Sequence, residues 1–282
     1  MRSTVFGILV NLVLVCVKGA AGVIGHSYAL TADAIESGAD VFSSLIVWYG
    51  LKIAGKAPDH NHPYGHGKAE PLAAAAVGFF LALAAGVIAT ESIRNILTPH
   101  RNPESFTLWV LSGTVGIKVV IFMYTHKTGK NIGSTAVKAD AMHHFSDALT
   151  SLMAFFGISI ALIGGAGYES ADDWAALAAS GVILYNSWKT IWPALREIMD
   201  EAPDKDTEKV VRQVAAHVPG VIDLEKCFVR KSGLDFYVDL HVHVNGSITV
   251  YEGHDIAHRV KEAVMAAQGN IRDVLVHVEP AE

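Results

Sequence analysis

The chain has 282 residues, a formal net charge of −6 and only 18% charged residues, and its mean hydropathy is +0.33. Soluble domains usually carry about 25% charged residues. Residues 1–199 hold 13 basic and 13 acidic side chains, whereas residues 200–282 hold 9 basic and 15 acidic ones. This contrast predicts a membrane domain over 1–199 and a water-soluble domain over 200–282. It argues against a secreted disulfide scaffold, a disordered chain and a nucleic-acid-binding protein.

Six apolar stretches in the first domain are each long enough to cross a bilayer as a helix. They cover residues 5–24, 29–53, 71–97, 106–124, 136–163 and 174–195. Lysines gather in the loops after the second and fourth stretches, at Lys56, Lys68, Lys127, Lys130 and Lys138. Because basic loops stay in the cytoplasm, both loops and both chain termini are expected there. The sequence therefore predicts a multi-pass protein of the cell (inner) membrane.

Ionisable residues recur at matched positions inside the second and fifth stretches. The spacing i, i+3, i+7 appears in both, as Asp33, Glu36 and Asp40 and as Asp140, His143 and Asp147. On a helix each trio shares one face. A carboxylate at membrane depth is costly and usually marks a pathway or a site. The alternative is that these groups only pack helices together, but six of them at matched spacing favour a site.

The two helices run in opposite directions and carry their motifs near the bilayer midplane, as substrate sites of transporters often do. Glu36, Asp40, His143 and Asp147 offer three carboxylates and one imidazole, which is a suitable tetrahedral set for a divalent metal. Lys18 and Lys118 are further buried charges. We expect them to snorkel or to pair with a carboxylate such as Glu91.

The loop after the second stretch is rich in metal-binding side chains. Asp59, His62 and His66, with His60 nearby, predict a second metal site. A short histidine-rich loop can also be merely solvated, and the composition alone leaves both interpretations open.

The pattern after residue 200 changes to helix, strand, strand, helix, strand. The expected ranges are 207–217, 222–230, 234–244, 250–267 and 274–278. Alternation in the second strand places His241 and His243 on the face opposite the core. His254 and His258 lie one turn apart on the second helix, and the last strand ends in His277-Val-Glu279. Pattern alone does not identify which of these residues are ligands.

Together these features resemble the cation diffusion facilitator family of divalent-metal transporters. The resemblance is carried by the paired motifs of the second and fifth stretches, by His62-Pro-Tyr-Gly-His-Gly-Lys-Ala-Glu70 and by the terminal His277-Val-Glu-Pro280. It implies a protomer with six transmembrane helices and a C-terminal α+β domain (αββαβ, ferredoxin-like). It also implies a homodimer in the lipid bilayer that exports Zn²⁺ or a similar ion in exchange for protons, and not an enzyme.

The resemblance also assigns site residues by position. The transport site would be Glu36, Asp40, His143 and Asp147, with Asp33 and Asp140 as nearby carboxylates on the same helix faces. Asp59, His62 and His66 would match the second site of the family. A binuclear cytoplasmic site near the dimer interface would use His241, His254, His277 and Glu279. Lys68 and Asp200 would form a charge interlock between the two domains.

Two departures bear on the metal. Zinc-exporting relatives usually have Asp or His at the position of Glu36, and some have Asp at that of Glu279. Harder oxygen ligands favour Fe²⁺ or Mn²⁺ over Zn²⁺. The chain also begins closer to its first span than relatives do, so a leading cytoplasmic segment is expected to be absent.

The function expected from these observations is a Zn²⁺/H⁺ antiporter that removes metal from the cytoplasm. The alternatives are an exporter of Fe²⁺, Mn²⁺ or Co²⁺, or a scaffold that senses metal without transporting it. A membrane metallohydrolase is disfavoured because the sequence contains no His-Glu-x-x-His motif.

Overall fold

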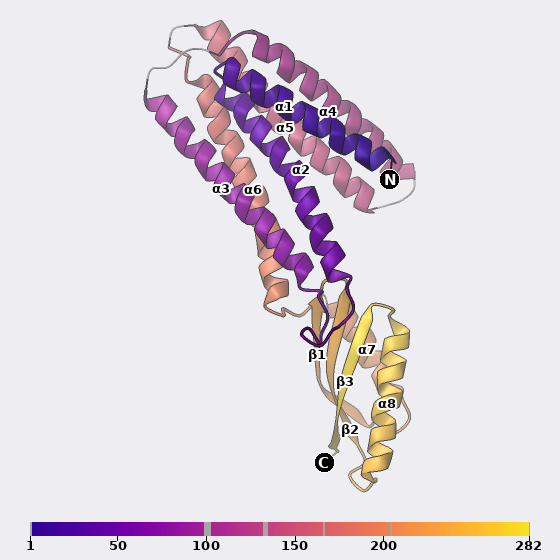
Figure 1. The fold of residues 1–282 in the computed structure, drawn as a ribbon. Coiled ribbons are helices and arrows are strands. Elements are labelled where there is room, and N and C mark those ends of the chain that lie inside the picture. Colours follow the sequence, from indigo (N-terminus) through magenta and orange to yellow (C-terminus); the bar gives the residue numbers. More distant parts are fainter. Residues whose placement is uncertain (1, 99–102, 132–134, 166, 204, 282) are drawn as a thin grey trace. The chain divides into compact units, whose positions relative to one another are not determined.

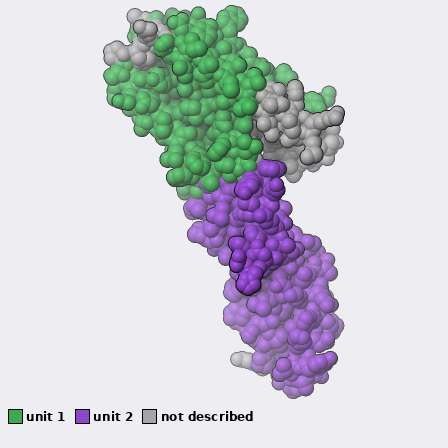
Figure 2. Space-filling model, viewed as in Figure 1, with its two compact units in different colours: residues 1–46, 76–191 green, residues 47–75, 192–282 purple. Residues whose placement is uncertain are grey.

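The computed structural model describes residues 2–98, 103–131, 135–165, 167–203 and 205–281. Within these ranges, the side chains of residues 2–11, 40, 43, 44, 47, 125, 128–131 and 135–146 are not described. The chain forms two compact units, coloured separately in Figure 2. The first comprises residues 1–46 and 76–191, and the second comprises residues 47–75 and 192–282.

Six long helices occupy the first 198 residues. They are α1 (Arg2–Ile24), α2 (Tyr28–Ala54), α3 (Ala69–Leu97), α4 (Phe106–Asn131), α5 (Thr135–Gly164) and α6 (Ala171–Ile198). Each predicted apolar stretch lies within one of them. Among the described residues, the segments long and apolar enough to cross a membrane are Ala69–Leu97, Phe106–Tyr124 and Asp147–Gly164. The structure therefore supports a helical membrane domain, and the total of six spans stays a prediction.

Small residues allow the helices of the first unit to approach one another closely, as is common in membranes. A Cβ added at Gly78 of α3 would lie 2.4 Å from Ile191 of α6. The Ser187 hydroxyl of α6 donates to the Gly78 carbonyl at 2.7 Å, and α3 and α6 run side by side in Figure 1. Gly157 of α5 approaches Ala175 of α6 in the same way, since an added Cβ there would lie 2.3 Å from the Ala175 Cβ.

The second unit contains the predicted αββαβ order. Its elements are α7 (Lys205–Ala216), β1 (Asp223–Ser232), β2 (Asp235–Val244), α8 (Val250–Ala267) and β3 (Ile271–Pro280). The sheet order is β1-β2-β3, with β1 antiparallel and β3 parallel to β2. The C-terminal α+β domain is confirmed. The main difference is that β3 begins at residue 271, three residues before the expected start, because it pairs with β2 from Phe236 onward.

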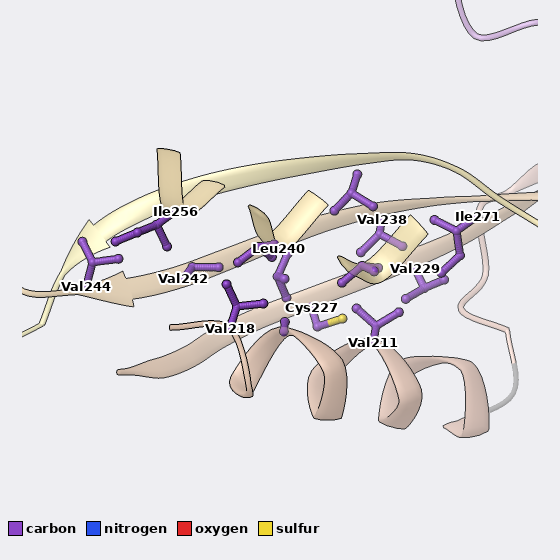
Figure 3. Close-up of a cluster of buried hydrophobic side chains, with 14 residues drawn as sticks. Val211, Val218, Cys227, Val229, Val238, Leu240, Val242, Val244, Ile256 and Ile271 are labelled. Atoms are coloured by element: carbon purple, nitrogen blue, oxygen red, sulfur yellow. The ribbon is translucent and has the colours of Figure 1, made fainter. Parts of the chain in front are cut away.

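One face of the sheet packs on α7 and α8 (Figures 1 and 3). Val238, Leu240, Val242 and Val244 of β2 are each at most 3% exposed. They form one hydrophobic cluster with side chains of both helices. His241 and His243, one residue out of phase with these positions, therefore point to the opposite face.

Candidate functional site

Three strands bring carboxylates and histidines together on the open face of the sheet. In the register of the parallel pair, His241 lies beside His277 and His243 lies beside Glu279. The side chains of neighbouring residues on one face stand close enough to interact. This placement follows from the strand register and the alternation of side chains.

Glu279 is the centre of this group. Its Oε1 lies 2.7 Å from His241 Nδ1 and 3.2 Å from His277 Nε2. Its Oε2 lies 3.4 Å from His243 Nε2. The hydrogen bond from His241 holds the pKa of Glu279 below its ordinary value, so the carboxylate stays ionised and available as a ligand.

Glu225 of β1 completes a second set of ligand atoms. There are two sets in which each residue offers one ligand atom and these ligand atoms lie within 4.8 Å of one another. The first set is His241, His277 and Glu279, and the second is Glu225, His243 and Glu279. Glu225 lies in a β-bulge between Leu224 and Cys227, and a bulge redirects a side chain out of the regular alternation. We call these five residues the sheet cluster.

The expected cytoplasmic set is only partly brought together. His241, His277 and Glu279 meet, but His254 lies on α8, which covers the opposite face of the sheet. Its side chain is exposed, and its ring lies 4.4 Å from that of His258. The sheet separates it from the cluster, so within one chain His254 is not a ligand of this site. Glu225 was not predicted at all, and His243 was predicted only as a member of the histidine face.

The loop between α2 and α3 brings together its own three predicted residues. Asp59 Oδ1 lies 3.0 Å from His62 Nδ1, and Asp59 Oδ2 lies 3.4 Å from His66 Nε2. All three side chains offer ligand atoms within 4.8 Å. The backbone N–H of His62 donates to Asp59 at 2.8 Å, and this bond is the main reason that the pKa of Asp59 lies below its ordinary value. We call these residues the loop cluster.

A tight turn closes the loop cluster. Gly65 N–H donates to the His62 carbonyl at 2.9 Å, with Pro63 at the second position of the turn. Gly65 has a φ of 77°, which glycine adopts without steric cost. The turn returns His66 toward Asp59. His60 is exposed and belongs to none of the three possible metal-binding sets found among the described residues.

Lys68 anchors the same loop within the second unit. Its Nζ lies 2.6 Å from Asp200 Oδ1, and it donates to the carbonyls of Glu197 and Lys231 at 2.5 and 3.3 Å. That the Lys68–Asp200 pair links the two domains stays a prediction. The Glu197 carboxylate in turn accepts from Lys231 Nζ and from the Gly233 N–H, both at 2.9 Å. The loop is therefore tied to the end of α6 and to the turn between β1 and β2. Glu197 and Lys231 were not predicted.

An aromatic contact fixes the loop at a second point. The Tyr237 hydroxyl donates to the Tyr64 carbonyl at 2.8 Å. The Arg230 guanidinium lies 5.3 Å from the Tyr64 ring and 5.8 Å from the Tyr237 ring, within range of cation–π attraction.

The predicted transport residues lie on α2 and α5. Glu36 is 6% exposed and Asp147 is 7% exposed. The side chains of Asp40, Asp140 and His143 are outside those that the structure describes. The four-residue transport site therefore stays a prediction; for Glu36 and Asp147 the structure shows that the side chains are buried.

The buried lysines form ion pairs, with a partner that differs from the expected one. Lys18 Nζ lies 2.6 Å from Asp33 Oδ2, and Lys118 Nζ lies 3.7 Å from Asp33 Oδ1. Glu91, which the sequence suggested as a partner, instead pairs with Arg94 at 3.2 Å. Asp33 can pair with both lysines because α1, α2 and α4 lie next to one another in the first unit. Spacing along the sequence does not reveal that these helices are neighbours.

Comparison with known proteins identifies the family. Residues 4–199 match the cation efflux transmembrane domain, and residues 203–281 match the cation efflux protein cytoplasmic domain. The chain belongs to the cation diffusion facilitator family. It is therefore a divalent-metal efflux transporter and not an enzyme, and a multi-pass membrane protein with a cytoplasmic C-terminal domain.

Relatives in the cation diffusion facilitator family align over nearly the whole chain. The manganese efflux system protein MneP of Bacillus subtilis is 30% identical over 99% of this chain and 95% of its own length. Metal tolerance protein 2 of Oryza sativa is 28% identical over 96% of this chain and 76% of its own. The magnetosome protein MamM of Paramagnetospirillum magneticum is 30% identical over 98% of this chain and 87% of its own length. A solved nickel form of a MamM CTD matches 28% of this chain and 100% of its own, at 25% identity and a TM-score of 0.28.

Proposed function

We propose that this protein is a six-span, proton-coupled exporter of a divalent first-row cation. It acts as a homodimer in the cell (inner) membrane with both chain termini in the cytoplasm. The transport site consists of Glu36, Asp40, His143 and Asp147. The observation that carries the proposal is the burial of Glu36 and Asp147 in the membrane domain of a cation efflux protein, because buried carboxylates in such a domain are costly unless they serve a pathway.

The coupling to protons follows from the chemistry of the ligands. Carboxylates and an imidazole bind a metal only after they lose their protons, so metal and protons compete for one site. Facing the cytoplasm, the site takes up metal and releases protons. Facing outward, incoming protons displace the metal, and the two orientations exchange by movement of helices around the site.

We propose Mn²⁺ as the substrate, ahead of the Zn²⁺ expected from the family resemblance. Three of the four ligands are carboxylates, and such hard oxygen donors suit Mn²⁺ well. The relative MneP, aligned over nearly the whole chain, is named as a manganese efflux protein. Export of Zn²⁺, Fe²⁺ or Co²⁺ stays a prediction that the same assay tests.

The sheet cluster would hold two ions in the cytoplasm, with Glu279 as a ligand to both. One ion would take His241 and His277, and the other Glu225 and His243, since these sets share only Glu279. The matching cytoplasmic domain is one that dimerises in this family, so metal binding there would adjust the dimer. His254 could contribute only from a second chain.

Metal flux into proteoliposomes tests the transport proposal. The purified protein is reconstituted with an imposed proton gradient, and uptake of Mn²⁺, Zn²⁺, Fe²⁺ and Co²⁺ is compared. We expect gradient-driven Mn²⁺ uptake that Asp147→Ala reduces to background. The exposed carboxylate Asp206, whose side chain is 92% exposed, provides the matched control Asp206→Ala, which should transport normally. Tight binding without flux would instead support the sensing scaffold.

A further inference from the structure

Two lysines and one aspartate form a buried group inside the membrane domain. Lys18 is 0%, Asp33 2% and Lys118 7% exposed. Each Asp33 oxygen faces one ammonium group, at 2.6 and 3.7 Å, and the Ser151 hydroxyl donates to Asp33 Oδ1 at 2.5 Å. We call Lys18, Asp33 and Lys118 the charge triad. The transport chemistry proposed above makes no use of it.

The charge triad contacts both helices that carry the proposed transport ligands. Lys118 Nζ donates to the backbone carbonyl of Asp147 at 3.1 Å. Lys18 Nζ donates to the hydroxyl of Ser37, the residue after Glu36, at 2.9 Å. Ser151 lies one helical turn after Asp147. The triad therefore links α2 and α5, the two helices that carry the ligands.

The charge balance gives the triad a second role. Two ammonium groups and one carboxylate leave one net positive charge. The proposed ligands Glu36, Asp40 and Asp147 bring three negative charges, and His143 is neutral when it binds metal. Asp140 of α5 adds a further negative charge when it is ionised. The net positive charge of the triad offsets part of this negative charge, so it weakens the attraction between the transport site and a cation.

We infer that Lys18 and Lys118 are positioning residues of the transporter. Their positive charges, balanced in part by Asp33, weaken the binding of the cation enough for its release, and neither lysine is itself a ligand. This inference rests on the proposed transport function.

A pair of single variants and their combination test the inference through transport kinetics. Lys118→Met adds one net negative charge to the group, so the KM for Mn²⁺ uptake should fall by about tenfold, from Coulomb attraction over a short distance. The maximal rate should fall as well, because a tightly held ion leaves slowly. Asp33→Asn removes one negative charge, so the KM should rise by about tenfold. The double variant restores the original charge and should return the KM to within about threefold of wild type.

Lys18→Met and its combination with Asp33→Asn repeat the test through the other lysine, should a Lys118 variant fail to fold. Lys189→Met, at an exposed position of α6, is the matched control and should leave the KM unchanged. Folding of each variant is checked by size-exclusion chromatography. A purely structural role predicts impaired uptake in both single variants without opposite KM shifts and without restoration, and that result would overturn the inference. Absence of Mn²⁺ and Zn²⁺ flux in the wild type would overturn the proposed function and this inference with it.

Discussion

Glu279 and His241 are hydrogen-bonded across the open face of the cytoplasmic sheet, at 2.7 Å. The same carboxylate also lies within 3.4 Å of two further histidine nitrogens. One side chain thereby joins both sets of ligand atoms, and this arrangement gives the first prediction.

Glu279→Ala should remove two bound ions from each chain, because Glu279 belongs to both sets of possible ligands. His277→Ala and His243→Ala should each weaken the binding of only one ion. A lost direct ligand should reduce affinity by at least about tenfold, since even supporting residues around a metal have effects of that size. Isothermal titration of the full-length protein with Mn²⁺ measures the number of sites. His217→Ala is the control, because that ring is exposed and contacts the Gln213 carbonyl. Equal losses in the three cluster variants would contradict a shared ligand.

Lys68→Ala should free the loop between α2 and α3. The ammonium group makes three contacts that tie the loop to α6 and to the β1–β2 turn, and its side chain is 35% exposed. After allowance for solvent screening, we expect a loss of about 1 kcal/mol in local stability. Hydrogen exchange of residues 57–68 in the full-length protein should accelerate several-fold. Lys56→Ala, on the same loop and exposed, should leave exchange unchanged, and equal acceleration in both variants would argue against a specific anchor.

Gly67→Ala should disturb the same loop by a steric route. A Cβ at Gly67 would lie 2.3 Å from the backbone oxygen of Ser232, a contact that requires the loop or the β1–β2 turn to shift. Overpacking of this kind costs about 1–3 kcal/mol. Gly55→Ala is the matched control, because its Cβ would meet its nearest neighbour, the Leu51 carbonyl, at 3.5 Å. Binding of Mn²⁺ to the loop cluster should weaken in the first variant only, as measured by titration.

The ion pair between Lys261 and Asp273 should contribute stability that depends on pH. Lys261 Nζ lies 2.5 Å from Asp273 Oδ1 and is the main reason that the pKa of Asp273 is lowered. A lowered carboxylate pKa contributes stability that is fully present above the ordinary pKa of Asp, near 4, and is lost as the pH falls through the folded value. Both side chains are more than a third exposed, so the pair contributes only about 0.5 kcal/mol.

Thermal unfolding of wild type and Lys261→Met checks this linkage. The midpoint should be slightly lower in the variant at pH 7, and the two midpoints should converge as the pH falls below the ordinary pKa of Asp and through the lowered folded value. Lys209→Met removes a similar surface pair with Asp206, for which the structure gives a longer 3.3 Å contact, and serves as the control. A difference that persists once Asp273 is protonated would show that packing of the Lys261 stem, and not its charge, is responsible.

The sequence predicted the loop cluster because its three members lie within eight residues and a proline turn brings them together. The histidine face of β2 was equally predictable, since side-chain alternation in a strand is a local property. Glu225 was not, because its position on that face depends on a bulge that disturbs the alternation. The structure places His254 on α8, on the other side of the sheet from His241 and Glu279, so its role in a site near the dimer interface stays a prediction.

The sequence by itself determined the division into an apolar and a charged part, the order of the helices and strands, and the residues with metal-binding chemistry. These properties depend on composition and on spacings of a few residues, where backbone geometry leaves few choices. Only the tertiary structure decided that Asp33 and not Glu91 pairs with Lys18 and Lys118, and that Glu279 belongs to two sets of possible ligands. Such partnerships join residues far apart in the chain, and they are selected by the packing of whole helices and strands and by the need to compensate every buried charge.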